Sequence, residues 1–590
     1  MDDSANIARH LPLMAARQPD HPAIKVPRGR TRDGRIDYLT LSFRELDAEV
    51  DAWVERLRAK GVRRGDRVLV MVRQGLPLIA AAFALFKLGA VPIIIDPGMG
   101  RESFLRCVER SRPRVLLGIP LAQCFSYVKR AAFKSVEVRV WVGGSATARV
   151  TRDSRSSASQ PEMVQSAAND LAAILFTSGS TGAPKGVCYE HGMFDAQVRL
   201  VRDCYRIQPG EVDLPLLPIF ALFNPALGMT TIVPELDPSK PATFNPAKIV
   251  QAIVQERVTN SFGSPTLWRK IAEHCRATNT TLPTLKRVLM AGAPVPPDLF
   301  AAVQSLMPQG VAHSPYGATE ALPLCSITAH EIATETAAAT AIGRGTCVGR
   351  PVPGIEIKII AITDTPIATL DEARELPPGE IGEIIVRGPV VTKLYDALPE
   401  ATAAAKIQTR NPERQSGAPG ADLEFGGLEM GASDVRSAPV WHRMGDAGFL
   451  DERGRLWFVG RKAERVETRQ GVLFPDQVEP IFNVHPDVRR TAFVGLGERP
   501  HQRAAIIAEP ISREVVATPS LRRKLVRELR ALAVQHAHTD RIRLAFLHPA
   551  FPVDVRHNAK IHRLKLAQWA EQHSGYELDK RDVSVESLKR

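Results

Sequence analysis

Hydrophobic and polar positions recur with two different periods along the first 180 residues. A capping-box pattern at Ser42 and Glu45 opens an amphipathic segment, which predicts a helix from about residue 43. Its apolar positions, at helical spacing, are Leu46, Val50, Trp53 and Leu57. Short apolar runs predict buried strands at residues 67–72, 91–95, 114–117, 136–142 and 172–176. An apolar segment ending at Leu88 predicts a helix between the first two runs, and this alternation is typical of an α/β fold with largely parallel sheets.

Two stretches lack such periodicity and are expected to be loops or linkers. Residues 145–169 are rich in Ser, Thr, Ala and Gln, and residues 407–438 hold ten Gly, Pro or Ser residues among 32. The second stretch is long for a connection inside a compact domain, so it is either partly disordered or a functional cover.

Composition places the chain among ordinary globular proteins, because 44% of its 590 residues are hydrophobic and 24% are charged. The formal net charge of +13 raises nucleic acid, anionic membranes and acidic small molecules as partners without choosing between them. The charge is uneven, with 24 basic and 16 acidic residues after Gly460. We therefore expect a separate C-terminal unit.

The seven cysteines contain no C-x-x-C pair, which argues against a disulfide framework or a zinc site. The chain begins with acidic rather than basic residues, so no secretory signal is apparent. The longest nearly apolar run, residues 76–86, is shorter than the roughly 18 residues that a membrane span requires. The sequence predicts a soluble, cytoplasmic protein without a membrane span.

The strand predicted at residues 172–176 runs directly into a loop of glycines, hydroxyls and a lysine. Glycines allow backbone N–H groups to approach an anion, hydroxyls donate to phosphate oxygens, and the lysine adds positive charge. The loop residues are Thr177, Ser178, Gly179, Ser180, Thr181, Gly182 and Lys185. The pattern is not a Walker A motif, because Pro184 precedes the lysine and Gly186 follows it. A bland surface turn is the alternative, and it rarely combines so many of these residue types.

A second cluster, Tyr316, Gly317, Thr319 and Glu320, joins an aromatic ring, a hydroxyl and a carboxylate. With the first loop it resembles the adenylate-forming superfamily, which includes acyl-CoA synthetases, fatty acyl-AMP ligases, luciferases and peptide-synthetase adenylation domains. Further matching motifs lie at residues 290–294, 379–383, 441–446 and 460–461 and at Lys560. The resemblance covers nearly the whole chain. It implies an α/β fold with a large N-terminal domain of mixed and parallel sheets, residues 1–463, and a smaller mobile α+β domain, residues 464–590.

By this resemblance, ATP and Mg²⁺ are the expected cofactors. The loop from Thr177 to Lys185 would hold the β and γ phosphates. The expected adenosine-binding residues are Gly292, Ala293, Pro294, Tyr316, Gly317, Asp446 and Arg461. Thr319 would contact the α-phosphate, Glu320 would bind Mg²⁺, and Lys560 would reach both the substrate carboxylate and the α-phosphate. The structural alternatives are a turn aspartate at Asp446 and a solvated surface lysine at Lys560.

Three departures from the superfamily pattern narrow the subfamily. Ala463 and Glu464 stand where a lysine and a hinge aspartate are usual, and Ala559 replaces the glycine before the catalytic lysine. Ala221 stands where many acyl-CoA synthetases have an aromatic residue or histidine, which argues against thioester formation by the common route. The segments 95–100, 220–223 and 558–561 look most like those of the olefin-pathway β-lactone synthetases, which convert a long-chain β-hydroxy acid and ATP into a β-lactone.

Alternative functions remain open at this point. An acyl-CoA ligase would share every nucleotide motif, and a fatty acyl-AMP ligase would stop at the adenylate. A basic nucleic-acid-binding or scaffold protein is a third alternative. The basic segment 521–530 could serve such a role, but its leucine spacing rather predicts an amphipathic helix with a solvated basic face. The resemblance also implies assembly with an α/β-hydrolase-fold protein and a ketoreductase. His191 is either a structural histidine at a helix start or the acceptor of the β-hydroxyl proton, a role open equally to a water or the departing phosphate.

Overall fold

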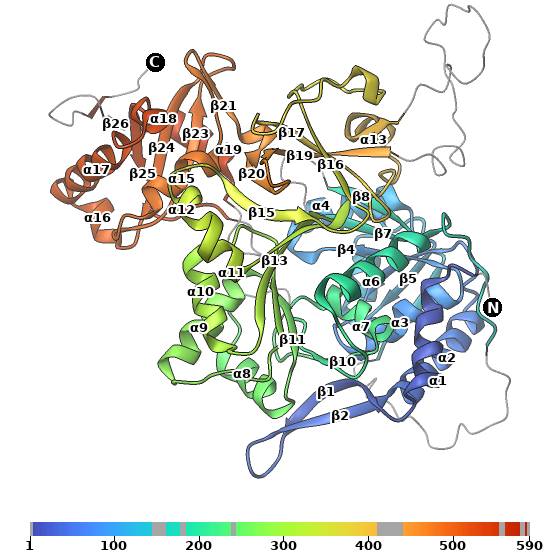
Figure 1. Ribbon diagram of the computed structural model, residues 1–590. Helices are drawn as coiled ribbons and strands as arrows, with labels where there is room; N and C mark the ends of the chain where they lie inside the picture. The colour runs from blue at the N-terminus through green and yellow to red at the C-terminus, as the bar shows by residue number, and fades with distance from the viewer. Residues whose placement is uncertain are drawn as a thin grey trace, which may run out of the picture.

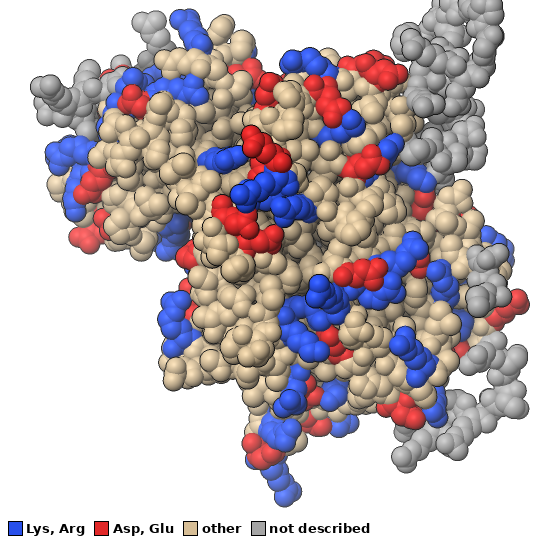
Figure 2. All heavy atoms as spheres, viewed as in Figure 1, with Lys and Arg blue, Asp and Glu red and all other residues tan. Residues whose placement is uncertain are grey.

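The computed structural model describes residues 4–143, 161–177, 184–237, 243–409, 440–553, 561–578 and 585–586. Within these ranges the strands form four sheets, with helices packed on them (Figure 1). The C-terminal elements from β21 (Val466–Thr468) onward lie beside the N-terminal ones at one end of the molecule. On the face shown in Figure 2, basic and acidic side chains are interspersed rather than gathered by sign.

The first sheet confirms the predicted parallel α/β unit. Its strands, in spatial order, are β6 (Val138–Trp141), β5 (Val115–Gly118), β3 (Arg67–Met71), β4 (Val91–Ile95), β7 (Leu171–Thr177) and β8 (Lys185–Glu190). The first five run parallel, and β8 returns antiparallel to β7. Helices connect the parallel strands, as such crossovers require. These are α3 (Leu76–Lys87), α4 (Arg101–Ser111) and α5 (Pro120–Val128).

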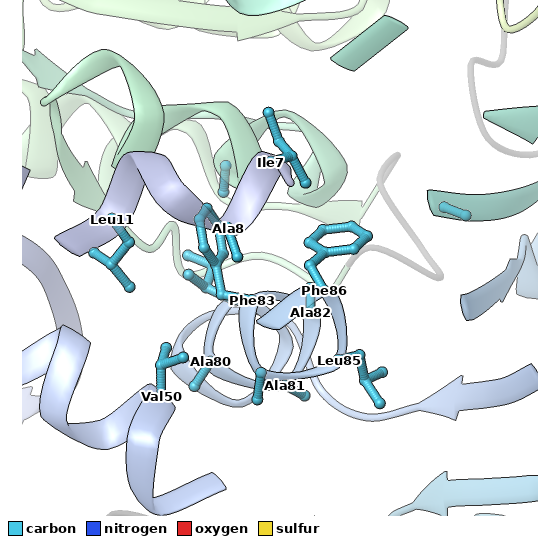
Figure 3. Packing of buried hydrophobic residues seen from close by; sticks show 14 of the residues in the cluster. Ile7, Ala8, Leu11, Val50, Ala80, Ala81, Ala82, Phe83, Leu85 and Phe86 are labelled. Carbon is cyan, nitrogen blue, oxygen red and sulfur yellow. The ribbon is translucent and has the colours of Figure 1, made fainter. Parts of the chain in front are cut away.

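The predicted capping box begins α2 (Phe43–Ala59). The Ser42 hydroxyl accepts a hydrogen bond from the Glu45 amide at 3.3 Å, and the Glu45 carboxylate accepts one from the Ser42 amide at 2.8 Å. These contacts satisfy donors that the first helical turn leaves unpaired. The apolar stripe of α2 then packs against α3, and Val50 lies on the α2 side of that contact (Figure 3).

Helix α3 is buried on almost every side, because its residues are apolar all round the helix. Three small residues, Ala80, Ala81 and Ala82, allow the backbones of neighbouring elements to approach it closely. Figure 3 shows the N-terminal elements η1 (Ile7–Arg9) and α1 (His10–Arg17) beside α3 as well, and α1 also contacts α2. Phe83 and Phe86 of α3 project toward a large internal cavity, so this helix joins the core to the candidate site.

The second sheet has 14 strands, of which 13 follow one another in a single order and the remaining one, β18 (Lys406–Gln408), pairs with β19 beside it. Its first seven strands, in spatial order, are β16 (Glu356–Ile360), β17 (Gly382–Arg387), β19 (Val440–Leu450), β20 (Leu456–Arg461), β15 (Thr346–Pro351), β14 (Ala321–Thr328) and β13 (Val311–Ala318). The order continues through β12 (Arg287–Met290), β11 (Asn260–Gly263), β9 (Val212–Asp213), β10 (Thr230–Ile232), β1 (Pro22–Arg30) and β2 (Ile36–Ser42). Parallel pairs join β11, β12 and β13, whereas β13, β14 and β15 pair antiparallel. The sheet is therefore mixed, as expected.

The C-terminal elements form their own five-stranded sheet. Its strands are β23 (Val488–Leu496), β24 (Arg503–Pro510), β25 (Leu544–Leu547), β26 (Gly575–Glu577) and β27 (Val585–Glu586). Helices α15 (Pro475–Asn483), α17 (Pro519–Ala533) and α19 (Arg563–Glu571) accompany it. Helix α17 confirms the amphipathic helix predicted for the basic segment, and it buries Leu525, Val526 and Leu529. A domain boundary near residue 463 remains our proposal.

The linker predicted at residues 407–438 begins too early. Ile407 lies in β18 (Lys406–Gln408), which pairs antiparallel with β19, and its side chain is fully buried. Three residues are too few to show a period, and the strand forms only through its long-range partner. Residues 410–439 lie outside the described residues. In the other predicted loop, residues 161–169 form neither helix nor strand, and residues 145–160 are not described.

No helix in the described ranges combines the length and the hydropathy needed to cross a bilayer.

A buried ionic network ties the middle of the 14-stranded sheet together. Arg287 on β12 forms a bidentate ion pair with Glu211, which precedes β9, and Asn260 on β11 donates to the same carboxylate at 2.7 Å. Burial alone would raise the pKa of Glu211, but the hydrogen bonds and charge of Arg287 outweigh burial and lower this pKa to about 2. The carboxylate therefore stabilises the folded state at neutral pH.

We expect Glu211→Gln to lower the free energy of unfolding at neutral pH by about 3 kcal/mol, because Arg287 would keep its buried charge without a carboxylate. The stabilising effect of a depressed pKa is complete above the ordinary value of 4.5 and is lost as pH falls toward about 2. The difference between parent and variant should therefore shrink by about 1 kcal/mol between neutral pH and roughly pH 3.5. Urea unfolding at each pH measures both values, and a difference that does not change with pH would contradict the assignment.

Candidate functional site

A cavity of about 1400 Å³ lies between the two large sheets. The six-stranded sheet contributes Val70, Ile94 and Leu175, and the 14-stranded sheet contributes Phe262 and Ser314. Three residues of the C-terminal part, Asp476, Ile561 and Arg563, also line it. The cavity therefore forms where three parts of the fold meet.

The structure brings most of the described candidate residues to this cavity. Those that line it are Lys185, Gly292, Ala293, Pro294, Tyr316, Gly317, Thr319, Glu320, Asp446 and Arg461. Thr177 is the last residue of β7, and its side chain is not described. Ser178, Gly179, Ser180, Thr181, Gly182 and Lys560 lie outside the described residues, so their roles stay predictions. Ile561, the residue after Lys560, reaches the cavity.

One corner of the cavity is built around the buried carboxylate of Asp446. Asp446 on β19 lies opposite Arg461 on β20 in the antiparallel register, and Arg461 Nη1 is 2.6 Å from Asp446 Oδ1. The Tyr316 hydroxyl on β13 donates to Asp446 Oδ2 at 2.6 Å. Burial and the Asp446 charge raise the pKa of Tyr316 well above its usual value, so Tyr316 remains a donor. Asp446 thus lies within a strand, and the alternative of a turn aspartate is wrong.

The Asp446 corner combines an aromatic ring with a fixed anionic acceptor. Gly292 follows β12 in a left-handed conformation with φ of 95°, which a side chain would strain, and its backbone faces the same cavity. A carboxylate held in this way can accept hydrogen bonds from two neighbouring hydroxyls, and the ring offers a flat apolar surface. This chemistry suits a nucleoside.

A second corner is formed by the turn that carries Thr319 and Glu320. The Tyr395 hydroxyl donates to Glu320 Oε1 at 2.9 Å, and the Thr392 amide donates to the Glu320 carbonyl at 2.8 Å. The Tyr189 hydroxyl on β8 donates to the Thr319 carbonyl. The turn is therefore fixed from two sides, with the Glu320 carboxylate in the cavity.

Two cations accompany Glu320, and sequence reasoning found only one of them. Lys185 Nζ lies 4.8 Å from the Tyr395 ring centroid. Lys406, at the start of β18, lies 5.8 Å from the same centroid, and its Nζ donates to the carbonyl and hydroxyl oxygens of Thr392. Burial lowers the pKa of Lys406 to about 7. In the sequence, Lys406 is noticeable only as a single lysine after three alanines. It stands directly before the predicted linker at residues 407–438 and was therefore not considered as a site residue.

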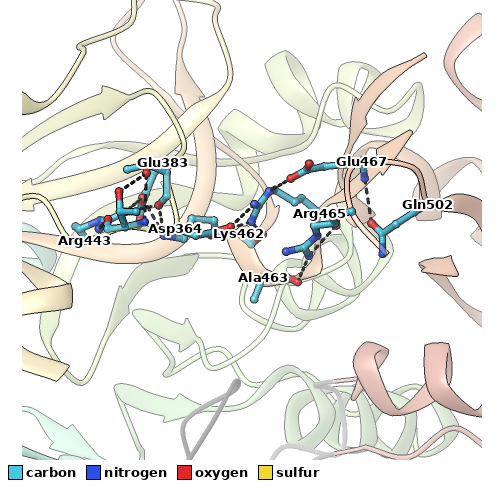
Figure 4. Close-up of polar contacts among 11 residues, drawn as sticks. Asp364, Glu383, Arg443, Lys462, Ala463, Arg465, Glu467 and Gln502 are labelled. Atoms are coloured by element: carbon cyan, nitrogen blue, oxygen red, sulfur yellow. Dashed lines mark hydrogen bonds and ion pairs between the residues drawn. The ribbon is translucent and has the colours of Figure 1, made fainter. Parts of the chain in front are cut away.

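The segment around residues 462–465, where the resemblance predicts a hinge, forms ion pairs with the N-terminal part of the chain (Figure 4). Glu383 of the N-terminal part binds Arg443 at 2.6 Å and Lys462 at 3.1 Å. Arg465, two residues after Ala463, pairs at 2.6 Å with Asp364 of the N-terminal part.

Glu464, in the place of the usual hinge aspartate, pairs with Arg563 at 3.1 Å. Arg563 also pairs with Glu479 at 2.6 Å, so the Glu464 carboxylate is bound to the C-terminal part. These ion pairs hold Ile561 and Arg563 against the cavity.

His191 does not line the cavity. It begins α6 (His191–Tyr205), is buried, and accepts a hydrogen bond from the Ile7 amide through Nδ1 at 3.2 Å. Burial lowers its pKa to about 4. The structural alternative for His191 is confirmed, and the proton-acceptor alternative is wrong because the ring already accepts a backbone hydrogen bond inside the core.

The rest of the cavity wall is largely apolar. One part is formed by α3, α6 and η3 (Pro218–Phe223), with Phe83, Phe86, Phe194, Leu222 and Phe223. Ala221 is buried next to this wall and does not line it. Such a surface binds alkyl chains rather than polar groups.

Comparisons with known proteins agree with this geometry. Residues 13–396 match the family described as AMP-binding enzyme. The chain is 44% identical over 580 residues to an olefin β-lactone synthetase of Xanthomonas campestris pv. campestris, covering 97% of this chain and 98% of that protein. It is 43% identical over 587 residues to an olefin β-lactone synthetase of Stenotrophomonas maltophilia, covering 98% and 100%. The ATP-bound structure of MatB from Rhodopseudomonas palustris shares the fold, with a TM-score of 0.71, 20% identity and coverage of 96% and 99%.

We expect Asp446→Asn to weaken ATP binding at least ~10-fold, because hydrogen bonds to a charged acceptor are replaced by weaker ones. Asp451→Asn is the matched control. Asp451 is equally buried near the end of the same strand and bonds Arg455 and Trp457, but it does not line the cavity. Calorimetric titration with ATP should show the loss only in the first variant. An equal loss in both would make Asp446 structural.

We expect Lys406→Met to slow adenylate formation at least ~10-fold, because the cation beside the Glu320 turn is lost. The thermal unfolding midpoint should not fall, since methionine removes the desolvation of a buried ammonium group. Lys393→Met is the matched control, because Lys393 pairs with Glu190 at 2.9 Å, whereas Lys406 lies beside Tyr395 and bonds to Thr392 at the Glu320 turn. That variant should lose stability and keep its rate. ATP–pyrophosphate exchange and calorimetry measure both properties, and the reverse pattern would contradict this role of Lys406.

Proposed function

Because the chain belongs to the AMP-binding enzyme family, we propose that it is an AMP-forming ligase that converts a long-chain β-hydroxy acid and ATP into a β-lactone in olefin biosynthesis. The observation that carries this proposal is 43–44% identity over nearly the whole chain to two olefin β-lactone synthetases. The cavity suits the reaction, since it joins a polar corner for a nucleotide to an apolar wall for an alkyl chain.

In the first half-reaction the substrate carboxylate attacks the α-phosphate of ATP, and pyrophosphate leaves. A carboxylate is already a nucleophile, so this step needs no general base. Asp446 and Tyr316 orient the nucleoside, Thr319 donates to the α-phosphate, and Lys185 with the glycine-rich loop receives the pyrophosphate. By family resemblance, Lys560 completes the site from the C-terminal part.

The donor set at the second corner fits Mg²⁺. Glu320 places a carboxylate in the cavity, and Mg²⁺ prefers one or two carboxylates together with phosphate oxygens. When bound there, the ion would neutralise phosphate charge as it develops. Tyr395 holds the carboxylate through a hydrogen bond to Oε1.

In the second half-reaction the β-hydroxyl attacks the carbonyl carbon of the acyl adenylate. A carbon–oxygen bond forms to the hydroxyl oxygen, the bond from the acyl carbon to the phosphate oxygen breaks, and AMP leaves with its electron pair. The nucleophile belongs to the same molecule, so its effective concentration is high. The hydroxyl proton passes to a water or to the departing phosphate, since His191 is buried away from the cavity.

The acyl-CoA ligase and fatty acyl-AMP ligase alternatives share the nucleotide corner. The 43–44% identity to the two synthetases favours the lactone-forming activity. No observation specifically favours a nucleic-acid-binding or scaffold protein. Assembly with an α/β-hydrolase-fold protein and a reductase, and a cytoplasmic location, remain predictions from the sequence.

Mass spectrometry of the products formed from ATP, Mg²⁺ and a β-hydroxy fatty acid tests the proposal. We expect a β-lactone without CoA, and one ¹⁸O atom transferred to AMP from substrate labelled in both carboxyl oxygens, because the carboxylate attacks phosphorus. Lys560→Ala should abolish the product, whereas Lys565→Ala, on the exposed side of α19, should not. A product that forms only with CoA, or unlabelled AMP, would contradict the proposed function.

A further inference from the structure

Helix α5 presents an apolar face to solvent. Leu121 and Val128 are each 75% exposed, Tyr127 is 57% exposed, and Cys124 between them is also exposed. These positions recur at helical spacing on the outer side of the helix. The other large apolar side chains that are this exposed in the described ranges are scattered along the chain. Contiguous exposed apolar surface in a folded protein marks an interaction site.

The inner face fixes this helix firmly to the sheet. Gln123 donates to the carbonyls of Leu116 and Val140 at 3.3 and 3.0 Å, and Phe125 packs edge-on against Phe104 and Phe133. The outer face of α5 is therefore apolar although the inner face of the helix is fully packed against the sheet.

The apolar surface continues onto β6, the edge strand of the six-stranded sheet. Trp141 is 45% exposed, and it pairs with Gly118, two residues before α5 begins. Two residues earlier on the same side of β6, the Arg139 guanidinium lies 4.3 Å from the Tyr127 ring centroid. The α5 surface, as we call it, consists of Leu121, Cys124, Tyr127, Val128 and Trp141.

Basic residues border the α5 surface. Residues 119–143 contain Lys129, Arg130, Lys134 and Arg139 and a single acidic residue, Glu137, which is paired with Arg114 at 2.9 Å. Arg130 and Lys134 are exposed directly after the helix. An apolar helix face, a tryptophan on the neighbouring strand and flanking Lys and Arg residues together give the composition of surfaces that lie in the interface of an anionic bilayer.

The cavity extends to the same helix. Ile119, Ala122 and Phe125 line it from the inner side of α5, and the highly exposed Leu121 lines it as well. An alkyl chain that leaves a bilayer at the α5 surface would therefore enter the cavity with little exposure to water.

We propose that the α5 surface docks on the surface of an anionic lipid bilayer, with the opening of the cavity toward the lipid. A second copy of the chain fits less well, because a two-fold contact would bring like-charged Arg130 and Lys134 clusters together. Docking of this kind needs no membrane span. The consequence for uptake of a long-chain acid rests on the proposed function, whereas binding to lipid does not.

Co-sedimentation of the full chain with vesicles, without ATP or substrate, tests the proposal. We expect binding to phosphatidylcholine vesicles that contain roughly a third of phosphatidylglycerol, little binding to pure phosphatidylcholine, and weakening by salt. Leu121→Glu combined with Val128→Glu should weaken binding at least ~10-fold, because two charges replace the apolar anchor. Val254→Glu combined with Val534→Glu makes the same change at exposed positions elsewhere and should bind like the parent.

A second variant keeps the test valid if the first one unfolds. Arg130→Gln with Lys134→Gln leaves the apolar face intact and should reduce both the binding and its dependence on salt. Failure of the parent to bind anionic vesicles would overturn the proposal, as would equal binding by the α5 and control variants. A change of sedimentation coefficient in the α5 variant, with no vesicle binding by the parent, would assign the surface to a protein contact instead. None of these outcomes depends on whether the product is a β-lactone.

Discussion

The pairing of the buried Asp446 carboxylate is the interaction on which the candidate site depends. A carboxylate removed from water is costly unless a cation and hydrogen-bond donors satisfy it. Arg461 supplies the charge and Tyr316 the donor, so β20 must pair with β19 in a fixed register and Tyr316 of β13 must lie within hydrogen-bond reach of Asp446. The polar groups of this corner and the arrangement of the strands are therefore specified together.

At the second corner of the cavity the Glu320 carboxylate is likewise held by partners, with Lys185 and Lys406 nearby. Glu320 lies on a turn that is bonded to Tyr395 and Thr392, and Lys406 donates to the Thr392 hydroxyl. The charged groups at this corner are therefore attached to backbone that is held by hydrogen bonds. Preorganisation of this kind reduces the cost of reorganising charges during a reaction.

Local patterns predicted the parts of the fold that depend on local interactions. The capping box at Ser42 and the apolar strand runs could be recognised because each pattern depends only on residues within or directly beside its own helix or strand. The short strand β18 and the buried charges Glu211 and Lys406 were missed, since their roles depend on partners far away in the chain. Motif resemblance, not periodicity, selected Tyr316, Asp446 and Arg461, which the structure brings together at one corner of the cavity, and their role toward a nucleotide stays a prediction. His191 shows the limit of single residues, because only packing against Ile7 and Phe86 distinguishes a core histidine from a catalytic one.

Helix α3 couples specificity to stability. Ala80 lies toward Val50 of α2 (Figure 3), whereas Ala82, Phe83 and Phe86 line the cavity, so one helix contributes to both the core and the binding space. A larger side chain at Ala80 would shift the helix and thereby reshape the cavity without lining it. Evolution of this enzyme toward longer or shorter alkyl chains is therefore constrained by the same packing that keeps the N-terminal core folded, and new substrate ranges would arise together with compensating changes in α2.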